Sequence, residues 1–488
     1  MNEAIKIHEK DDVLIALRPF KKGEVVEGLT LLSDIPQGHK IALRDLPAGH
    51  RVLKYGNVIG ILSAPVKKGE WIHSHNLRTS LEERPIYHYA KETVAPVKAS
   101  SFTWKGFLRF DGRAGVRNDL YLIPTVGCIN GTVESIKAAF IVSHPEMAHR
   151  VMILTHPYGC SQLGDDLSNT RRLLSGLASN PNAGGVLVIG LGCENNRLAE
   201  FMPLLNRVDP KRLRSYNAQE VADDVAYGLS MAEELYDIMK KDVRVDLPLS
   251  KLSIGLKCGG SDGLSGLTAN PLVGLVSDLI GGAGAQVALT EVPEMFGAEQ
   301  ALMNRARDEG TYHKIISLIN DFKDYYAANH QPCYENPSPG NKDGGITTLE
   351  EKSSGCILKG GHLEVEDVLK IGEPLIKGGL NLIDGPGNDI VASTNVAAAG
   401  ASILIFTTGR GTPFGSIIPT IKVATNHTLA SSKPSWIDYD GERAFDLGFP
   451  AARDELLALL LRVASGEETQ AEKHGIASIA LFKSGVTL

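Results

Sequence analysis

The sequence lacks the features that mark exported and membrane-bound proteins. The residues from Met1 to Asp12 are charged and include no apolar stretch followed by a small-residue cleavage site, so we expect no signal peptide. The most apolar run, about Val396 to Phe406, falls short of the roughly 18 residues that indicate a membrane span. Six cysteines in 488 residues, without an export signal, are most simply free thiols in a reducing compartment. We therefore expect a cytoplasmic protein that is not bound to a membrane.

Several motifs of common enzyme and binding-protein classes are also missing. No Gly-x-x-x-x-Gly-Lys-Ser/Thr sequence supports a P-loop, and Gly190-Leu-Gly192 lacks the third glycine of a dinucleotide fingerprint. There is no Gly-x-Ser-x-Gly elbow. The absence of Cys-x-x-Cys disfavours a zinc ribbon or a thioredoxin-like site. With 50 basic and 57 acidic residues, the net charge of −7 argues against a nucleic-acid partner.

The composition and length indicate a globular protein of several domains. Hydrophobic residues make up 43% and charged residues 22% of the chain, which is ordinary for a globular protein. At roughly 100–200 residues per domain, the length suits two to four domains. In residues 1–92, short β-branched runs alternate with Gly and Pro turn signals, which predicts a small all-β domain. A linker is predicted over 93–104, followed by α/β domains over 105–247 and 248–488.

The remainder of the chain alternates apolar runs with helical patterns. This alternation predicts mostly parallel sheets with helices on both faces, and ligands in such sheets bind beyond the carboxyl ends of the strands. The longest helical stretches are Ala218–Lys240 and Glu299–Ala328. The predicted strands are Leu120–Val126, Val151–Thr155, Val186–Leu191, Leu252–Leu256, Gln286–Thr290 and Ser402–Thr407.

A Gly-Cys pair recurs after the apolar runs. The cysteines concerned are Cys128, Cys160, Cys193 and Cys258, and a further pair is Gly355-Cys356. Glycine at a strand end lets the backbone turn sharply, so each thiol can face the strand-end crevice. Any one of these cysteines alone is explained as a small buried hydrophobic residue, whereas the set favours a functional role for at least two.

Three further groups carry chemistry. If His73-Ser-His75 is a strand, both imidazoles share a face and can reach one ion; a pair of surface histidines near a turn is the alternative. Arg113 and Arg117 lie in a glycine-broken loop and can hold a carboxylate, or the loop is simply solvated. Glu291 and Glu294 follow a predicted strand, where they can act in acid–base or metal chemistry or as structural caps.

Long motifs along the chain resemble a known family. His39-Lys-Ile-Ala-Leu43, Lys54-Tyr-Gly56 and His73-x-His75-Asn76 resemble the SAF-type (β-clip-like) domain of sugar-acid dehydratases. The large region of the altronate and galactarate dehydratase family is similar to the following segments: Gly112–Asn118, His156–Ser161, Gly190–Asn195, Lys257–Asp262, Asn336–Asn341, Thr347–Glu350 and Thr407–Pro413. The similarity covers nearly the whole chain.

The resemblance implies metal-dependent dehydration of a small-molecule hexonic acid. The expected reaction converts D-altronate to 2-dehydro-3-deoxy-D-gluconate and water. Galactarate dehydration and a sulfolactate-type sulfo-lyase reaction are the alternatives. Fe²⁺ is the expected cofactor, with Mn²⁺ as a substitute, because a chelated cation stabilises the enediolate that forms when the proton beside the carboxylate leaves. A non-enzymatic sugar-acid binding or regulatory protein is the alternative of another class, and a homodimer is expected only from its general frequency.

The predicted site lies between the small β domain and the crevice of the large region. The predicted catalytic residues are His39, Lys54 and His156; the substrate-binding residues are Arg113, Arg117 and Arg410; and the metal ligands are His73, His75, Cys128, Cys160 and Glu194. The alternative cofactor is an iron–sulfur cluster with one open iron, on Cys128, Cys160, Cys193 or Cys258.

Overall fold

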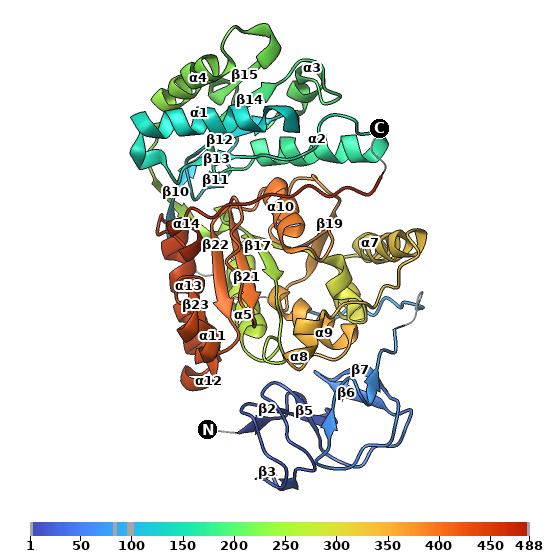
Figure 1. Cartoon of the computed structure of the whole chain (residues 1–488). Coiled ribbons are helices and arrows are strands. Elements are labelled where there is room, and N and C mark those ends of the chain that lie inside the picture. Colours follow the sequence, from blue (N-terminus) through green and yellow to red (C-terminus); the bar gives the residue numbers. More distant parts are fainter. Residues whose placement is uncertain (1–2, 82–84, 95–101, 486–488) are drawn as a thin grey trace.

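The computed structural model describes residues 3–81, 85–94 and 102–485, and it divides into three stacked domains. In Figure 1 an N-terminal β domain (residues 3–80) lies at the bottom, a C-terminal domain (residues 249–485) occupies the centre, and a middle domain (residues 103–248) lies at the top. Most of the linker predicted over 93–104 lies outside the described residues. Among the helices of the described chain, none is long and apolar enough to cross a membrane.

The β domain consists of short antiparallel strands, as the Gly- and Pro-punctuated sequence predicts. Its sheets have the orders β1-β2-β5-β8, β6-β7-β9 and β3-β4. Glycines at the turns hold positive φ angles, for example +82° at Gly38, which only glycine adopts without strain. The strands are β1 (Ala4–Ile5), β2 (Val13–Ala16), β3 (Val25–Val26), β4 (Leu29–Thr30), β5 (Lys40–Ala42), β6 (Arg51–Lys54), β7 (Asn57–Leu62), β8 (Trp71–Ile72) and β9 (Leu77–Arg78).

The middle domain has a parallel four-stranded sheet in the order β13-β12-β14-β15. Its strands are β12 (Asp119–Pro124), β13 (Val151–Ile153), β14 (Ala183–Gly190) and β15 (Leu213–Asn217), and its helices are α1 (Asn130–Ser143), α2 (Gly164–Ala178), α3 (Leu198–Phe201) and α4 (Asp224–Met239). A small antiparallel sheet of β10 (Thr103–Leu108), β11 (Ala114–Gly115) and β16 (Val245–Pro248) links it to the C-terminal domain.

The C-terminal domain is built on a parallel sheet in the order β19-β20-β18-β17-β21-β22-β23. Its strands are β17 (Ser253–Cys258), β18 (Gln286–Leu289), β19 (Val365–Leu369), β20 (Gly379–Ile383), β21 (Ile403–Thr408), β22 (Thr420–Ala424) and β23 (Tyr439–Asp440). Its helices are α5 (Ala269–Gly282), α6 (Glu299–Asn304), α7 (Glu309–Ala328), α8 (Pro339–Asp343), α9 (Leu349–Cys356), α10 (Asp389–Ala399), α11 (His427–Ser432), α12 (Arg443–Leu447), α13 (Phe449–Ala464) and α14 (Gln470–Lys473).

All the strands predicted in the α/β region are present, and its two main sheets are parallel as predicted. The predicted helix Glu299–Ala328 is instead two helices, α6 and α7. The break follows from capping: the side chain of Asp308 accepts a hydrogen bond of 2.7 Å from the backbone N–H of Thr311 and so starts a new helix. The stretch Ala218–Lys240 likewise begins as a short 3-10 turn before α4, which Asp223 caps.

The strand order of the C-terminal sheet reverses beside β17. After β17 the chain builds toward β18 and β20 on one side, and it returns with β21 and β22 on the other side. The crevice beyond the carboxyl ends of β17 and β21 is therefore the topological switch point, where open α/β sheets bind ligands. The β domain docks over this end of the sheet.

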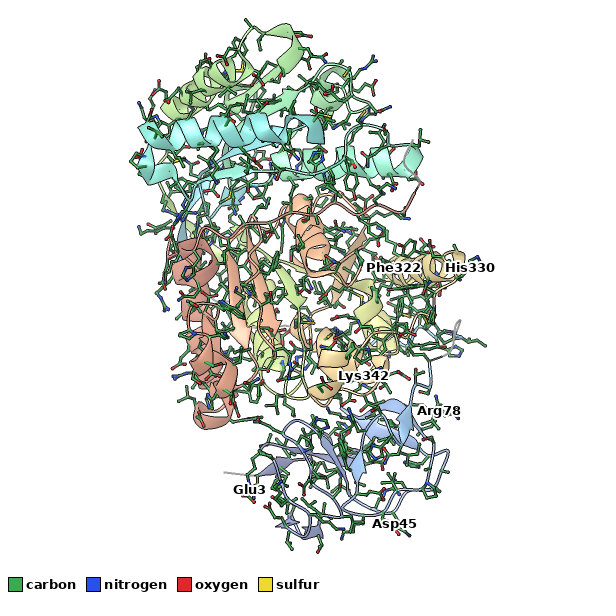
Figure 2. The ribbon with its side chains drawn as sticks, in the orientation of Figure 1. Glu3, Asp45, Arg78, Phe322, His330 and Lys342 are labelled. Atoms are coloured by element: carbon green, nitrogen blue, oxygen red, sulfur yellow. The ribbon has the colours of Figure 1, made fainter. Side chains whose placement is uncertain are left out.

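The docked position of the β domain is fixed by a shared apolar core. Leu264 and Leu267 of the C-terminal domain are buried in the same cluster as Val13, Ile15 and Ile72 of the β domain. The backbones also meet closely, because a Cβ added at Gly263 would lie 2.0 Å from the carbonyl oxygen of Gly38. Figure 2 places Lys342 of α8 on the C-terminal side of this contact and Arg78 on the β-domain side.

Candidate active site beneath the docked β domain

A pocket opens at the switch point, between the C-terminal domain and the β domain. Its volume is about 390 Å³. The loop that follows β17 contributes Asp262, the loop that follows β21 contributes Gly409 and Arg410, and the β domain contributes Gln37 and Gly38. Arg410 is exposed at the pocket, so its guanidinium is available to an anion. The pocket therefore combines a cation with hydrogen-bonding groups from two domains.

Asp262 shapes this pocket from beneath. Its carboxylate accepts hydrogen bonds from the hydroxyl of Thr425 at 2.8 Å and from the amide of Asn426 at 3.1 Å, which ties the loops after β17 and β22 together. Burial raises the pKa of Asp262 above its usual range. The adjacent hydroxyl of Ser261 is buried and, in the described part of the chain, has no hydrogen-bond partner. An unpaired buried hydroxyl beside a pocket is a natural contact for a ligand hydroxyl.

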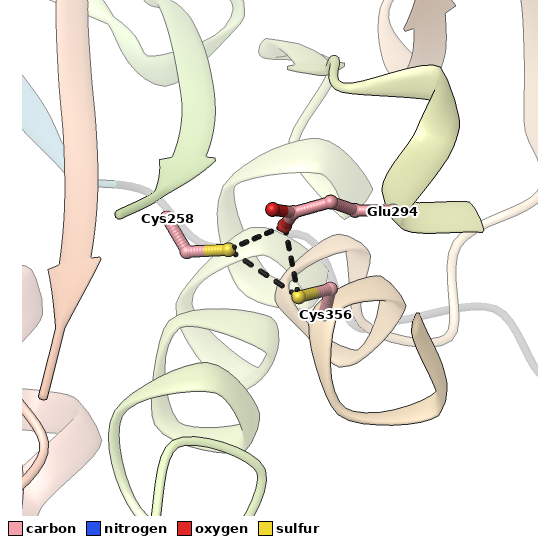
Figure 3. A group of neighbouring side chains, drawn as sticks. All are labelled: Cys258, Glu294 and Cys356. Carbon is pink, nitrogen blue, oxygen red and sulfur yellow. Dashed lines mark hydrogen bonds between the residues drawn. The ribbon is translucent and has the colours of Figure 1, made fainter. Parts of the chain in front are cut away.

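Behind the loop 259–262 lies a buried group of charged and thiol side chains, which we call the charged core. Its members are Lys257, Cys258, Glu291, Glu294, Lys352, Cys356 and Lys359. Figure 3 shows its centre, where the Sγ atoms of Cys258 and Cys356 lie 3.3 Å apart and 2.9 and 3.1 Å from Oε2 of Glu294. Among the described residues, only these three form a group of His, Cys, Asp or Glu donor atoms all within 4.8 Å of one another.

Lysines surround this centre. The Nζ atom of Lys352 lies 2.7 Å from Oε1 of Glu294, and the Nζ atom of Lys257 lies 2.6 Å from Oε1 of Glu291. Lys257 also contacts Asp389 at 2.7 Å, whose side chain is 38% exposed and so connects the core to the surface. Buried charges are costly unless they are paired, so a core of this size points to function rather than to stability.

Burial and the charges within the core shift the pKa values of its members. Burial raises the pKa of Glu291 well above its usual range, and the charge of Glu294 adds to this effect. Burial opposes ionisation of Glu294 too, but Lys352 and Lys359 outweigh it and lower that pKa. The hydrogen bond from Cys356 lowers the pKa of Cys258 to about 6, with help from the charges of Lys359 and Lys352. The core therefore pairs a carboxyl whose pKa is raised with a thiol whose pKa is lowered.

The backbone at Glu291 is unusual. Its φ is +71°, in the left-handed region that a residue with a Cβ rarely adopts. The strained turn begins the short 3-10 helix η7 (Val292–Met295) directly after β18, and it aims both glutamates at the end of β17. Strain of this kind persists where the surrounding structure holds it, and it clusters at active sites.

Helix α9 connects the charged core to the β domain. Its C-terminal residue Cys356 belongs to the core, whereas Glu351 bonds to the ammonium groups of Lys40 and Lys54, each at 2.8 Å. All three of these side chains are at most 1% exposed. Burial disfavours the charge of Glu351, but the two lysines outweigh it and lower the pKa of Glu351 to about 2. The same helix thus holds the β domain and completes the core.

Histidines of the β domain line the same interface. His39 accepts a hydrogen bond at Nδ1 from the indole of Trp71 and has Nε2 3.3 Å from the carbonyl of Asp343. His73 contacts Oγ1 of Thr347 at 3.1 Å, while His75 is exposed. The strand β8 ends at Ile72, so His73 and His75 lie in a turn, and the strand geometry that would put both on one face is absent.

We expect these histidines to make the docked structure acid-sensitive. Burial, with the charge of Lys40, lowers the pKa of His39 to about 4 and that of His73 to about 3. An unfolded histidine takes up a proton near pH 6.5, so below that pH the unfolded chain binds more protons and the free energy of unfolding falls by about 1–3 kcal/mol by pH 4.5. Urea unfolding between pH 7.5 and 4.5 measures this.

The double variant His39→Gln/His73→Gln is expected to lose part of that pH dependence. His75→Gln, at the exposed neighbouring histidine, is the matched control and is expected to keep it. Equal slopes for the two variants would contradict the assignment.

Two of the three predicted catalytic residues point to structural roles. Burial opposes the charge of Lys54, but Glu351 outweighs it and raises the pKa of Lys54, which disfavours its use as a base. His156 is buried, with Nε2 at 3.0 Å from the carbonyl of Pro124 and Nδ1 accepting from the backbone N–H of Tyr158, and burial lowers its pKa to about 4. A role for His39 stays a prediction, since it faces the docking contact beside the pocket.

The predicted arginines are divided between the two edges of the sheets. Arg410 lines the pocket at the carboxyl edge. Arg113 lies beside Ser253 and Gln286, the first residues of β17 and β18, at the opposite edge. Arg117 is buried and donates to the carboxylate of Glu472 and to the carbonyls of Val116, Val463 and Glu467, so it packs the domains together.

The predicted metal-ligand set does not assemble within the chain. His73 and His75 belong to the β domain, whereas Cys128, Cys160 and Glu194 follow strands of the middle domain at the other end of the molecule (Figure 1). The carboxylate of Glu194 is moreover occupied by the hydroxyl of Thr125 and the backbone N–H groups of Leu191 and Gly192. The prediction that both groups share one metal site is therefore corrected, because the C-terminal domain separates the two groups.

Sequence reasoning underestimated the charged core. The Gly-Cys pairs marked Cys258 and Cys356, and the strand end marked Glu291 and Glu294, but no pattern joined them. Two lysines give one further indication. Lys257 directly precedes Cys258, Lys352 lies four residues before Cys356, and both stand in buried segments.

Comparison with known proteins agrees with this architecture. Residues 2–80 match the altronate/galactarate dehydratase SAF domain, 106–240 the second domain of D-galactarate dehydratase/altronate hydrolase, and 249–487 the C-terminal domain of D-galactarate/altronate dehydratase. The fold thus defines a three-part α/β protein with an SAF domain over its largest sheet. The chain belongs to the altronate/galactarate dehydratase family.

Two relatives match over essentially the full length, and a third matches over most of it. Altronate dehydratase of Bacillus subtilis (strain 168) is 48% identical over 100% of both chains. Altronate dehydratase of Escherichia coli (strain K12) is 46% identical over 99% of both chains. Galactarate dehydratase (L-threo-forming) of Escherichia coli (strain K12) is 34% identical over 89% of this chain and 86% of the relative.

Proposed function

We propose that this chain is a hydro-lyase that dehydrates altronate to 2-dehydro-3-deoxygluconate. The observation that carries the proposal is the interface pocket, which brings the cationic Arg410, the buried carboxyl of Asp262 and the docked β domain to one switch point in a chain that is similar to altronate dehydratases over its full length. In the reaction a base takes the C2 proton, an acid protonates the C3 hydroxyl so that it leaves as water, and the enol that results tautomerises to the ketone.

Chain residues account for substrate binding. Arg410 binds the substrate carboxylate with its planar fork of N–H donors. Asn426 borders the same space and bonds to the hydroxyls of the sugar chain. Leu264 and the docked Gly38 close two sides, which limits the access of water to the reacting carbons.

The charged core supplies a proton for the leaving hydroxyl. Burial and the nearby charge of Glu294 raise the pKa of Glu291 well above its usual range. A carboxylic acid poised in this way is a suitable general acid. Lys257, which lies 2.6 Å from Oε1 of Glu291, stabilises the carboxylate that remains after the transfer.

The iron that the family resemblance implies fits the centre of the charged core. Two thiols and a carboxylate oxygen converge there within 4.8 Å, and thiolates with a carboxylate suit a borderline divalent ion such as Fe²⁺. Cys258, Glu294 and Cys356 would hold it. When bound, a divalent ion supplies Lewis-acid stabilisation of negative charge on the hydroxy acid.

A substrate panel tests the function. Purified protein with Fe²⁺, kept from air, is assayed with altronate, galactarate and sulfolactate for keto-acid and for sulfite. Keto-acid from altronate with the highest kcat/KM supports the proposal. Preference for galactarate, release of sulfite, or no product from any of the three would contradict it, and the last outcome would favour a binding protein.

Replacement of Arg410 tests the carboxylate clamp. Charge-assisted hydrogen bonds contribute about 1.5–3 kcal/mol, so Arg410→Ala is expected to lower kcat/KM about 100-fold, mainly through a higher KM. The kcat/KM of Arg410→Lys is expected to lie between those of the wild type and Arg410→Ala. Steady-state kinetics on altronate measures this. Arg462→Ala, at an exposed arginine paired with Glu467, is the control and is expected to match the wild type.

We propose further that the protein works in the cytoplasm as a homodimer. Support comes from the thiol content of the chain and from the general frequency of twofold oligomers. Light scattering of the full chain that gave a monomer mass would contradict the dimer.

A further inference from the structure

The middle domain carries a second concentration of thiols, far from the interface pocket. Cys128, Cys160 and Cys193 are all exposed, whereas Cys258 and Cys356 are buried. Cysteine without a disulfide is among the most buried residue types, so exposed cysteines grouped at one edge need an explanation. We call these three residues the tri-cysteine edge.

The sheet topology brings the three cysteines together. Cys160 follows β13, Cys128 follows β12, and Cys193 follows β14, and these strands are direct neighbours in the order β13-β12-β14. Because the strands are parallel, their carboxyl ends meet at one edge, with neighbours about 4.8 Å apart. Each cysteine stands directly after a glycine, so the same local pattern is repeated on three loops.

Hydrogen bonds hold the three loops against one another. The backbone N–H of Gly127 donates to the carbonyl of Tyr158, and that of Asn196 donates to the carbonyl of Gly159, both at 2.9 Å. The side chain of Asn196 also reaches the carbonyl of Thr125 at 3.0 Å, so all three loops are joined. The thiols therefore sit on a preorganised edge rather than on independent loops.

The loops approach so closely that the glycines are required. A Cβ at Gly159, whose φ is +100°, would lie 2.0 Å from the carbonyl oxygen of Thr125. Next to Cys160, Ser161 holds a left-handed φ of +57° while its N–H donates to Asn195. Backbone strain in a residue with a Cβ is typical of functional sites, and here it lies directly beside one of the thiols.

The thiols of the tri-cysteine edge are not spaced as the ligands of a single ion. In the described chain, the only group with three donor atoms within 4.8 Å is that of the charged core, so the thiols of the tri-cysteine edge are spread more widely than the ligands of one ion. An iron–sulfur cluster has its cysteines on different irons and so accepts a wider spacing. Donors to sulfur are also present, with Nε2 of Gln219 3.6 Å from Sγ of Cys193 and the hydroxyl of Ser161 3.9 Å from Sγ of Cys160.

We infer that the tri-cysteine edge binds a [4Fe–4S] cluster through Cys128, Cys160 and Cys193. Three thiolates leave one iron without a cysteine, open to a water or to an oxygen ligand. This site is distinct from the charged core, and it does not depend on the proposed substrate.

Reconstitution tests the inference. The full chain is incubated without air with ferrous iron and sulfide, desalted, and analysed for iron and acid-labile sulfide, with visible absorbance and electron paramagnetic resonance of the reduced sample. The wild type is expected to hold about four sulfides per chain. Single variants Cys128→Ser, Cys160→Ser and Cys193→Ser are expected to hold roughly fivefold less, because a cluster that loses one of three ligands is released.

Two controls separate this site from the charged core. Cys333→Ser, at a half-buried cysteine after α7, and Cys258→Ser are both expected to keep the sulfide of the wild type. Thermal unfolding confirms that each variant is folded, which the exposure of the three cysteines favours. Sulfide at the level of a protein-free blank, iron without sulfide, or equal sulfide in the wild type and the three variants would overturn the inference.

Discussion

Cys258→Ser is expected to lower turnover about 100- to 1000-fold, because it takes a thiolate out of the charged core. A serine hydroxyl stays protonated near neutral pH and is a poor ligand for Fe²⁺, so the variant loses the stabilisation that a bound cation gives to developing negative charge. The hydrogen bonds of the Cys258 thiol with Cys356 and Glu294 are weakened as well. Steady-state kinetics on altronate with added Fe²⁺, together with iron analysis of the protein, measures both effects.

The matched control is Cys333→Ser, which changes a cysteine outside the core. It is expected to keep full turnover and full iron content. If Cys258→Ser turned over at the wild-type rate with its iron retained, the charged core would not be the metal centre. Calorimetry of both variants shows whether a loss of turnover comes from unfolding.

Glu351→Gln is expected to destabilise the protein by about 3–5 kcal/mol, because it leaves the ammonium groups of Lys40 and Lys54 buried without a counter-charge. An amide accepts a hydrogen bond from one lysine but carries no charge. Since Glu351 lies on α9, which ends at Cys356, turnover is expected to fall with stability. Urea unfolding followed by tryptophan fluorescence, which includes Trp71 at the interface, measures the change.

Glu364→Gln is the control for charge removal alone. Glu364 pairs with Lys91 at 3.2 Å on the surface, where an ion pair contributes less than about 1 kcal/mol. Similar losses for the two variants would show that the buried Lys40–Glu351–Lys54 group does not hold the β domain.

The central strands of both parallel sheets could be predicted because apolar runs report burial directly, whereas β15, β19, β20, β22 and β23 were not predicted. The run Leu252–Leu256 became the central strand β17, and Ser402–Thr407 became its neighbour β21. The break between α6 and α7 was missed because one capping residue, Asp308, outweighs a helical pattern that continues on both sides. The segment His73–His75 is too short for its sequence to distinguish a strand from a turn.

The site was harder to predict because it depends on contacts between distant segments. Cys258 and Cys356 are 98 residues apart, and only the path of the chain through β18 and α9 brings their sulfur atoms within 3.3 Å. The arginines show the converse. Arg117 and Arg410 have the same donor groups, but one is saturated by Glu472 and backbone carbonyls and the other faces a pocket, which no local pattern reveals.

Helix α9 makes attachment of the β domain and occupancy of the charged core thermodynamically reciprocal. Whatever binds at Cys356 and favours the present position of α9 also strengthens the grip of Glu351 on Lys40 and Lys54. By linkage, each event tightens the other by the same factor. Through this helix of eight residues, a ligand bound at the charged core would thus stabilise the docked position of the β domain.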